Sequence, residues 1–117
     1  MTARSPITTH VLDTARGFPA VGIAVNLDVM ESGGQWRNIG AGTTDAAGRL
    51  NTLLADSVPL ARGRYRLIFA TEAYFAALSL PAFYPQIVVE FEVAATDEHY
   101  HVPLLISPYG YSTYRGT

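Results

Sequence analysis

The chain has 117 residues, 49% of them hydrophobic and 15% charged, and its formal net charge at pH 7 is −2. This length and composition predict one folded domain over residues 1–117, with disorder left open for residues 1–5. The small negative charge argues against nucleic acid and acidic membranes as partners, and the absence of Cys and Lys excludes disulfides, thiolate metal sites and Schiff-base chemistry.

The first half of the chain predicts short strands separated by polar turns. Residues 7–13 are rich in β-branched side chains, and their alternation places Thr8, His10 and Leu12 on one face of a strand. Turn-forming Gly, Pro and Asp residues punctuate the sequence that follows. Further strands are expected at residues 21–31 and 35–43 and a short one at 52–54, with turns at 16–19, 32–34 and 44–48.

A helix is expected between two strongly alternating strands, residues 64–70 and 86–94. Thr71 is placed as the N-cap of this helix, over residues 72–80, and Pro81 is expected to end it because proline cannot continue the hydrogen-bond ladder. If the two strands pair antiparallel, two Arg face two Glu, and each such pair contributes about 0.2–1 kcal/mol. The four residues are Arg64, Arg66, Glu90 and Glu92.

The last stretch predicts a strand at residues 99–107, a turn at 108–110 and a closing strand at 111–115. Pro103 conflicts with a strand interior, because proline prefers edges and bulges. The whole pattern is seven to eight short strands, frequent turns and one short helix. It is typical of an all-β fold, an antiparallel β-sandwich.

The three histidines are the first candidates for chemistry. His10 lies in mid-strand, where a lone histidine is more often a hydrogen-bonded core or interface residue than a catalytic one. His99 and His101 lie two residues apart and share a strand face, so a three-histidine zinc site stays open as a weak alternative. His99 follows Glu98 at a loop edge and is expected to be solvated.

Arg49 follows Gly48 in a turn, where an arginine is usually a solvated surface charge. Its planar guanidinium could also bind a carbonyl, a carboxylate or a urate-like ring. Asp45 and Asp56 are expected to be turn residues. No two carboxylates in the sequence have convincing acid–base spacing, so a glycosidase mechanism is not indicated. No nucleophile elbow is present either. The residues alone therefore indicate a β-sandwich with a candidate His/Arg site.

Four segments of the chain carry a resemblance to a known family. They are residues 8–13 with 17–20, residues 43–50, the triplet Phe83-Tyr84-Pro85, and residues 99–116. With these motifs in this order, the chain resembles the 5-hydroxyisourate hydrolases, the transthyretin-like enzymes of urate breakdown. The last segment distinguishes the hydrolases from transthyretin proper, the hormone carrier.

The resemblance implies a transthyretin-like sandwich and a set of functional residues. It places catalytic residues at His10, Arg49 and His101, and it places substrate-binding residues at His10, Arg49 and the final tetrapeptide. That tetrapeptide is Tyr114-Arg115-Gly116-Thr117, in which Thr117 stands where the family has Ser. The resemblance also implies a homotetramer with sites at the interface between dimers, and it implies no metal and no organic cofactor.

The expected reaction is hydrolysis of 5-hydroxyisourate to 2-oxo-4-hydroxy-4-carboxy-5-ureidoimidazoline. One of His10 and His101 is expected to act as the general base and the other to orient water or substrate. Two alternatives stay open: a transthyretin-like binding protein without turnover, and a zinc-binding or structural sandwich. No signal-peptide core is recognisable in residues 1–5, so a cytoplasmic location is expected.

Overall fold

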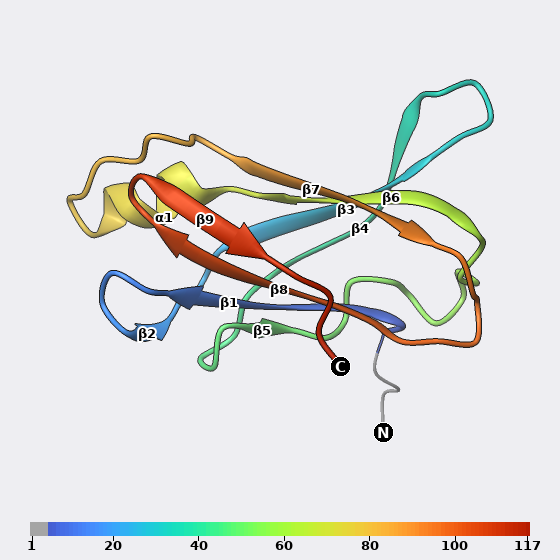
Figure 1. Cartoon of the computed structure of the whole chain (residues 1–117), viewed down its shortest axis with the longest axis horizontal. Helices are drawn as coiled ribbons and strands as arrows, with labels where there is room; N and C mark the ends of the chain where they lie inside the picture. Colours follow the sequence, from blue (N-terminus) through green and yellow to red (C-terminus); the bar gives the residue numbers. More distant parts are fainter. Residues whose placement is uncertain (1–4) are drawn as a thin grey trace.

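The computed structural model describes residues 5–117, which form two facing β-sheets and one short helix (Figure 1). Seven strands have four to eight residues, and two have only two residues. The elements are β1 (Ile7–Asp13), β2 (Phe18–Pro19), β3 (Ala24–Met30), β4 (Trp36–Thr43), β5 (Arg49–Leu50), β6 (Gly63–Phe69), α1 (Thr71–Ala77), β7 (Ile87–Val93), β8 (Tyr100–Ser107) and β9 (Gly110–Thr113).

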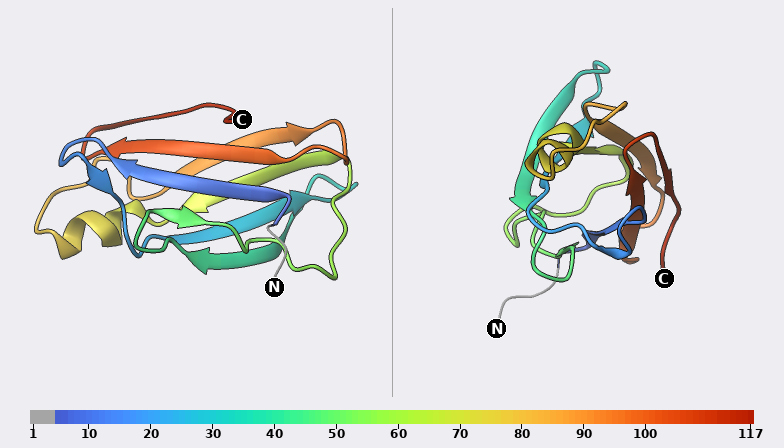
Figure 2. Two further views of the ribbon diagram at one scale, coloured as in Figure 1. Left: turned by 90° about the horizontal axis from the view of Figure 1, so that it is seen from below. Right: turned by 90° about the vertical axis from the view of Figure 1, so that its left-hand side faces the viewer.

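The two sheets face each other, as the right-hand view in Figure 2 shows, and the apolar core lies between them. One sheet has the strand order β2-β1-β8-β9, with β5 also paired to β1, and the other has the order β4-β3-β6-β7. This arrangement confirms the predicted β-sandwich with one short helix. One pairing differs from the prediction: β1 and β8 are parallel, whereas the other strand pairs are antiparallel.

The predicted strand at residues 52–54 is wrong, because this stretch is a loop. Leu53 and Leu54 are nonetheless buried, with 2% and 3% of their surface exposed. The apolar side chains of Leu53 and Leu54 therefore indicate burial in the core and not pairing in a strand. Ser5, also buried, accepts a hydrogen bond from the Leu54 N–H on its Oγ at 3.1 Å. The rest of the segment for which disorder was left open, residues 1–4, lies outside the described residues.

The helix starts and ends earlier than predicted. Its N-cap is Ala70, and the Thr71 hydroxyl instead donates to the Tyr84 carbonyl. Its end is not set by Pro81: Ser79 takes a left-handed conformation (φ 60°), and the N–H groups of Leu80 and Ser79 donate back to Phe75 and Ala76. This is the Schellman pattern, which closes a helix without proline. No helix in residues 5–117 is long and apolar enough to cross a membrane.

The predicted pairing of charged residues across β6 and β7 is confirmed in register, since Arg64 lies opposite Glu92 and Arg66 opposite Glu90. The ion pairs follow this register only in part. Arg64 reaches both glutamates at 3.7–3.8 Å, whereas Arg66 turns to Asp28 on β3, at 2.9 Å. Asp28 is buried, with 6% of its surface exposed, so it offers Arg66 a less screened partner than an exposed glutamate does.

Asp13, at the end of β1, is buried and accepts four hydrogen bonds. They come from the Tyr74 hydroxyl at 2.8 Å, from Arg16 Nε at 3.2 Å, and from the backbone N–H groups of Ala15 and Arg16 at 3.1 Å. Burial raises the pKa of this carboxyl, but the hydrogen bonds from Tyr74 and Arg16 outweigh burial and hold the pKa below its ordinary value. The ionised form is therefore favoured in the folded chain.

Asp13 is expected to make folding sensitive to acid. Because its pKa is lower in the folded than in the unfolded chain, its stabilising contribution is present above the unfolded pKa and is lost as pH falls through the folded one. We expect Asp13→Asn to lower the free energy of unfolding near pH 7 by about 1.5–3 kcal/mol and to flatten its decline in acid. Urea titrations at several pH values check this, with Asp97→Asn in an exposed loop as control. Parallel pH curves for the wild type and Asp13→Asn would contradict it.

Candidate active site

The pairing of β1 with β5 and β8 brings the three predicted catalytic residues to one surface. His10 lies opposite Arg49 on β5 and opposite Pro103 on β8, and Thr8 lies opposite His101. The alternate residues of β1 and β8, such as Val11 and Leu104, point into the core and are fully buried. The candidate site therefore lies on the outer face of the sheet, and Thr8, His10 and Leu12 share one face of β1, as the alternation in residues 7–13 predicted.

A cavity of about 320 Å³ joins these residues on that face. It contains His10, Arg49 and His101 and three of the four residues of the predicted tetrapeptide. The sheet itself forms the floor. The lining residues are His10, Leu12, Arg49, His101, Pro103, Leu104, Leu105, Tyr114, Gly116 and Thr117.

One ring nitrogen of His10 is fixed by the backbone. Its Nε2 lies 2.9 Å from the carbonyl oxygen of Ala47, in the turn before β5. A carbonyl oxygen only accepts, so Nε2 carries the hydrogen and Nδ1 of the neutral ring keeps the lone pair. His10 is half-buried, and its Nδ1 is thus the hydrogen-bond acceptor of the ring.

The turn before β5 positions Arg49 through Asp45. The carboxylate of Asp45 accepts the N–H groups of Ala47 and Arg49, both at 2.9 Å, and these two bonds, that of Arg49 foremost, hold the pKa of Asp45 below its ordinary value. Gly48 has φ 77°, and a Cβ there would lie 2.5 Å from the Val11 carbonyl oxygen, so the turn requires glycine. The predicted turn role of Asp45 is confirmed, and the turn leaves Arg49 exposed at the rim of the cavity.

His101 is held on two sides. Its Nδ1 lies 2.8 Å from the Thr8 hydroxyl oxygen, and its carbonyl accepts the Gly116 N–H at 2.8 Å. A Cβ on Gly116 would lie 2.6 Å from His101 Cδ2, so the chain passes against the ring edge that ends in Nε2. The prediction that His99 is solvated is wrong: His99 is half-buried, and its Nε2 lies 2.9 Å from the same Thr8 oxygen.

Pro103 is tolerated within β8 because the ladder of backbone hydrogen bonds between β8 and the C-terminal segment is interrupted beside it. The carbonyls of His101 and Pro103 accept from Gly116 N–H and the Thr113 hydroxyl, so the donorless nitrogen of Pro103 faces the same side. There β9 ends at Thr113, and pairing resumes only at Gly116, the partner of His101. Figure 2 shows this last segment running along the outside of the sheet. The gap releases two residues, Tyr114 and Arg115, from the ladder.

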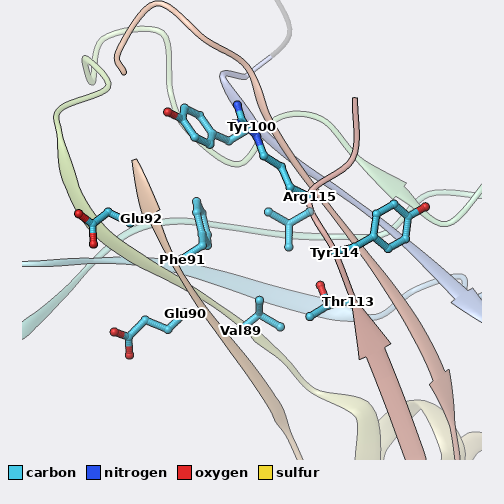
Figure 3. Close-up of a pocket in the computed structure, with 9 residues that line it drawn as sticks. Val89, Glu90, Phe91, Glu92, Tyr100, Thr113, Tyr114 and Arg115 are labelled. Carbon is cyan, nitrogen blue, oxygen red and sulfur yellow. The ribbon is translucent and has the colours of Figure 1, made fainter. Parts of the chain in front are cut away.

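Of the predicted site residues, Arg115 alone lies outside the cavity. Its guanidinium stacks on the Tyr100 ring at 4.4 Å and donates to Glu98 at 3.0 Å and to the His99 carbonyl at 3.2 Å. Figure 3 shows this side chain directed toward Tyr100, with the Tyr114 ring directed away from it. Arg115 therefore borders a second cavity of about 230 Å³, which Tyr114 also lines.

Gly116→Ala is expected to disable the site by displacing the His101 ring. The added methyl group would overlap His101 Cδ2 and crowd Pro103, and a displacement of a functional group by about 1 Å can cost about 10²-fold in rate. We expect a fall of that size in kcat, measured by steady-state kinetics. Gly33→Ala, where a Cβ meets nothing within 4 Å, is the matched control. Equal kcat values for the two variants would contradict this role of Gly116.

Metal binding has little support in the arrangement of side chains. Among residues 5–117, no three or more His, Cys, Asp or Glu side chains are grouped closely enough to hold a metal ion. His99 and His101 share Thr8, with ring centroids 6.4 Å apart. The sequence did not single out Thr8 as a site residue, and this residue is 1% exposed.

Comparison with known proteins gives one consistent result. Residues 7–116 match the model of the HIUase/Transthyretin family. The 5-hydroxyisourate hydrolase of Salmonella dublin is 46% identical over 111 residues, which cover 95% of this chain and 80% of that protein. Among solved structures, sea bream transthyretin in complex with thyroxine has a TM-score of 0.88 at 31% identity, covering 96% of this chain and 95% of that one. Klebsiella pneumoniae 5-hydroxyisourate hydrolase has a TM-score of 0.81 at 35% identity, covering 95% and 98%.

Proposed function

This chain belongs to the HIUase/transthyretin family, and on that premise we propose that it hydrolyses 5-hydroxyisourate to 2-oxo-4-hydroxy-4-carboxy-5-ureidoimidazoline. Relatives 46% and 42% identical to it, from Salmonella dublin and the mouse, bear the name 5-hydroxyisourate hydrolase. The observation that carries the proposal is the single cavity containing His10, Arg49 and His101. A general base and an always-charged donor beside one small cavity are what hydrolysis of a cyclic amide needs.

The reaction adds one water across the ring amide bond. The water oxygen bonds to the carbonyl carbon, and its proton passes to a histidine. The carbonyl oxygen becomes an oxyanion, the C–N bond then breaks, and the ring nitrogen takes the proton, so that a carboxylic acid and a ureido group result. We propose that the protein's own side chains supply every group that these reaction steps require.

His10 and His101 fit the proton-transfer roles, because histidine exchanges protons near neutral pH. One acts as base toward water, and the other orients water or substrate. Arg49 donates to a ring oxygen and stabilises the oxyanion, a contribution of about 2.7–4 kcal/mol for a well-placed donor. Leu12 and Leu105 give the floor apolar area against the flat ring.

The tetrapeptide takes two different roles in this proposal. Tyr114, Gly116 and Thr117 line the cavity and bind substrate, the Thr117 hydroxyl offering one donor and acceptor. Arg115 supports the site from outside by fixing the segment to Glu98 and to the His99 carbonyl. In this proposal, Arg115 fixes the path of the C-terminal segment and does not contact the substrate ring.

We further propose a homotetramer whose sites lie between dimers. An exposed aromatic patch supports association, since Phe83 and Tyr109 are 65% and 68% exposed, with ring centroids 6.5 Å apart. Tyr84 and Tyr111 extend this patch with an edge-on contact at 5.2 Å. Light scattering should give four times the chain mass of 12.7 kDa. A monomer with full turnover would contradict a shared site.

We also propose that the activity is located in the cytoplasm, which cell fractionation tests.

A coupled ultraviolet assay tests the function. Urate oxidase generates fresh 5-hydroxyisourate, and its decay is followed with and without the protein, in buffer containing a chelator. Decay faster than the spontaneous reaction is expected. A decay rate equal to the spontaneous rate would overturn the proposal and favour the alternative, a small-molecule carrier. The structural similarity to transthyretin supports that alternative. Tight thyroxine binding without turnover would establish that alternative.

A further inference from the structure

Thr8 lies between His101, which is on β8, and His99, which directly precedes β8. Thr8 does not line the cavity. Its hydroxyl oxygen is 2.9 Å from His99 Nε2 and 2.8 Å from His101 Nδ1. Thr8 is 1% exposed, so its hydroxyl is shielded from bulk water. Buried polar groups of this kind are satisfied by fixed partners, and their hydrogen positions are correlated.

The hydroxyl has one hydrogen to give and two lone pairs. If it donates to His99 Nε2, it can accept from His101 Nδ1–H, and His101 then keeps a lone pair on Nε2. If it donates to His101 Nδ1, neutral His101 must carry its hydrogen on Nε2 and has no basic nitrogen left. A single hydroxyl hydrogen therefore decides whether His101 can act as a base.

We propose that Thr8, with His99 as the acceptor of its hydrogen, is a positioning residue that holds His101 in the Nδ1–H form. Resting on the proposed function, this assigns the general base to His101 Nε2. The ring edge that ends in Nε2 is the one against Gly116, in the segment that lines the cavity. His10, whose Nε2–H is bound to Ala47, then orients water or substrate through Nδ1.

Like charges on the two rings would oppose this arrangement. The centroids of His99 and His101 are 6.4 Å apart and the rings are nearly parallel, at 19°. A proton on His99 would remove the acceptor that the Thr8 hydrogen needs and would disfavour a second proton on His101. Neutral His99 is thus the state in which Thr8 supports the base.

The direct test is nitrogen NMR of the full-length protein labelled with ¹⁵N-histidine. The chain has three histidines, and each signal is assigned from the variant that lacks it. We expect wild-type His101 to show a protonated Nδ1 and an unprotonated Nε2, and we expect Thr8→Val to shift hydrogen to Nε2. A wild-type His101 protonated on Nε2 overturns the proposal.

Kinetics provide the second arm. Thr8→Val is expected to lower kcat by about 10–100-fold, the loss typical when the hydrogen-bond partner that orients a metal-bound histidine is removed, with KM little changed. Thr8→Ser restores the hydroxyl and should restore kcat, and His99→Gln, which keeps an acceptor, should retain more turnover than His99→Leu. A Thr8→Val variant with wild-type kcat overturns the proposal.

Thr9→Val is the matched control for folding. Thr9 is the buried neighbour of Thr8, and its hydroxyl donates to the Val102 carbonyl across the same strand pair, at 2.6 Å. Its loss should lower stability without changing the tautomer of His101. An equal change in tautomer from Thr9→Val would reduce Thr8 to a structural role. Because NMR needs no turnover, the expected tautomer in an inactive protein would support the role of Thr8 in fixing the Nδ1–H form of His101, while refuting the proposed hydrolase and with it the assignment of the base.

Discussion

Replacing His101 with Asn is expected to lower kcat by about 10²–10⁴-fold, the range that a positioned general base contributes. Asn is smaller than His and can still hydrogen-bond to Thr8, but it cannot take a proton from water near neutral pH. The backbone bond from Gly116 N–H to the residue-101 carbonyl does not depend on the side chain. The fold and the assembly should therefore persist while the chemistry fails, and stopped-flow decay of fresh 5-hydroxyisourate measures the loss.

Two measurements separate loss of the base from loss of binding. Urate, used as a non-hydrolysed ring of similar shape, should bind His101→Asn with nearly the wild-type Kd in calorimetry. Imidazole added to the buffer should restore part of the turnover of this variant and none to Gly116→Ala, in which the ring is present but displaced. Turnover of His101→Asn close to wild type would remove His101 from the mechanism.

The grouping of side chains on the two faces of β1 could be predicted from residues 7–13, because successive side chains of a strand point to opposite faces. That alternation placed His10 on the face opposite to Val11 before any partner strand was known. The parallel pairing of β1 with β8 could not be predicted the same way. Strand direction depends on the path of the connections, and alternation is identical for either direction.

The supporting groups of the site could not be predicted, for physical reasons. Thr8 meets His101 across 93 residues of sequence, and its role depends on an exact register between two strands. The direction of Arg115 depends on the ladder gap at Pro103 and on the positions of Glu98 and Tyr100. Motif resemblance identified which residue types meet here, whereas packing decided which of them face the cavity.

Replacing Arg49 with Ala is expected to cost about 10²–10³-fold in kcat, equivalent to about 2.7–4 kcal/mol of transition-state stabilisation. The side chain is exposed, and its backbone is held by Asp45 and not by its own guanidinium, so the turn should survive the change. Thermal unfolding should therefore match the wild type. Arg37→Ala, on β4 of the opposite sheet, removes the same charge far from the cavity and serves as control.

Arg49→Lys distinguishes geometry from charge at this position. Lysine keeps the positive charge but lacks the planar, forked donor set that matches a carbonyl or an oxyanion in two places. If Arg49 acts through its fork, Arg49→Lys should recover only a small part of the lost kcat, and guanidinium ion should rescue Arg49→Ala. If the charge alone matters, Lys should restore most of the rate. A loss in Arg49→Ala no larger than in Arg37→Ala would mean that the oxyanion is stabilised elsewhere in the cavity.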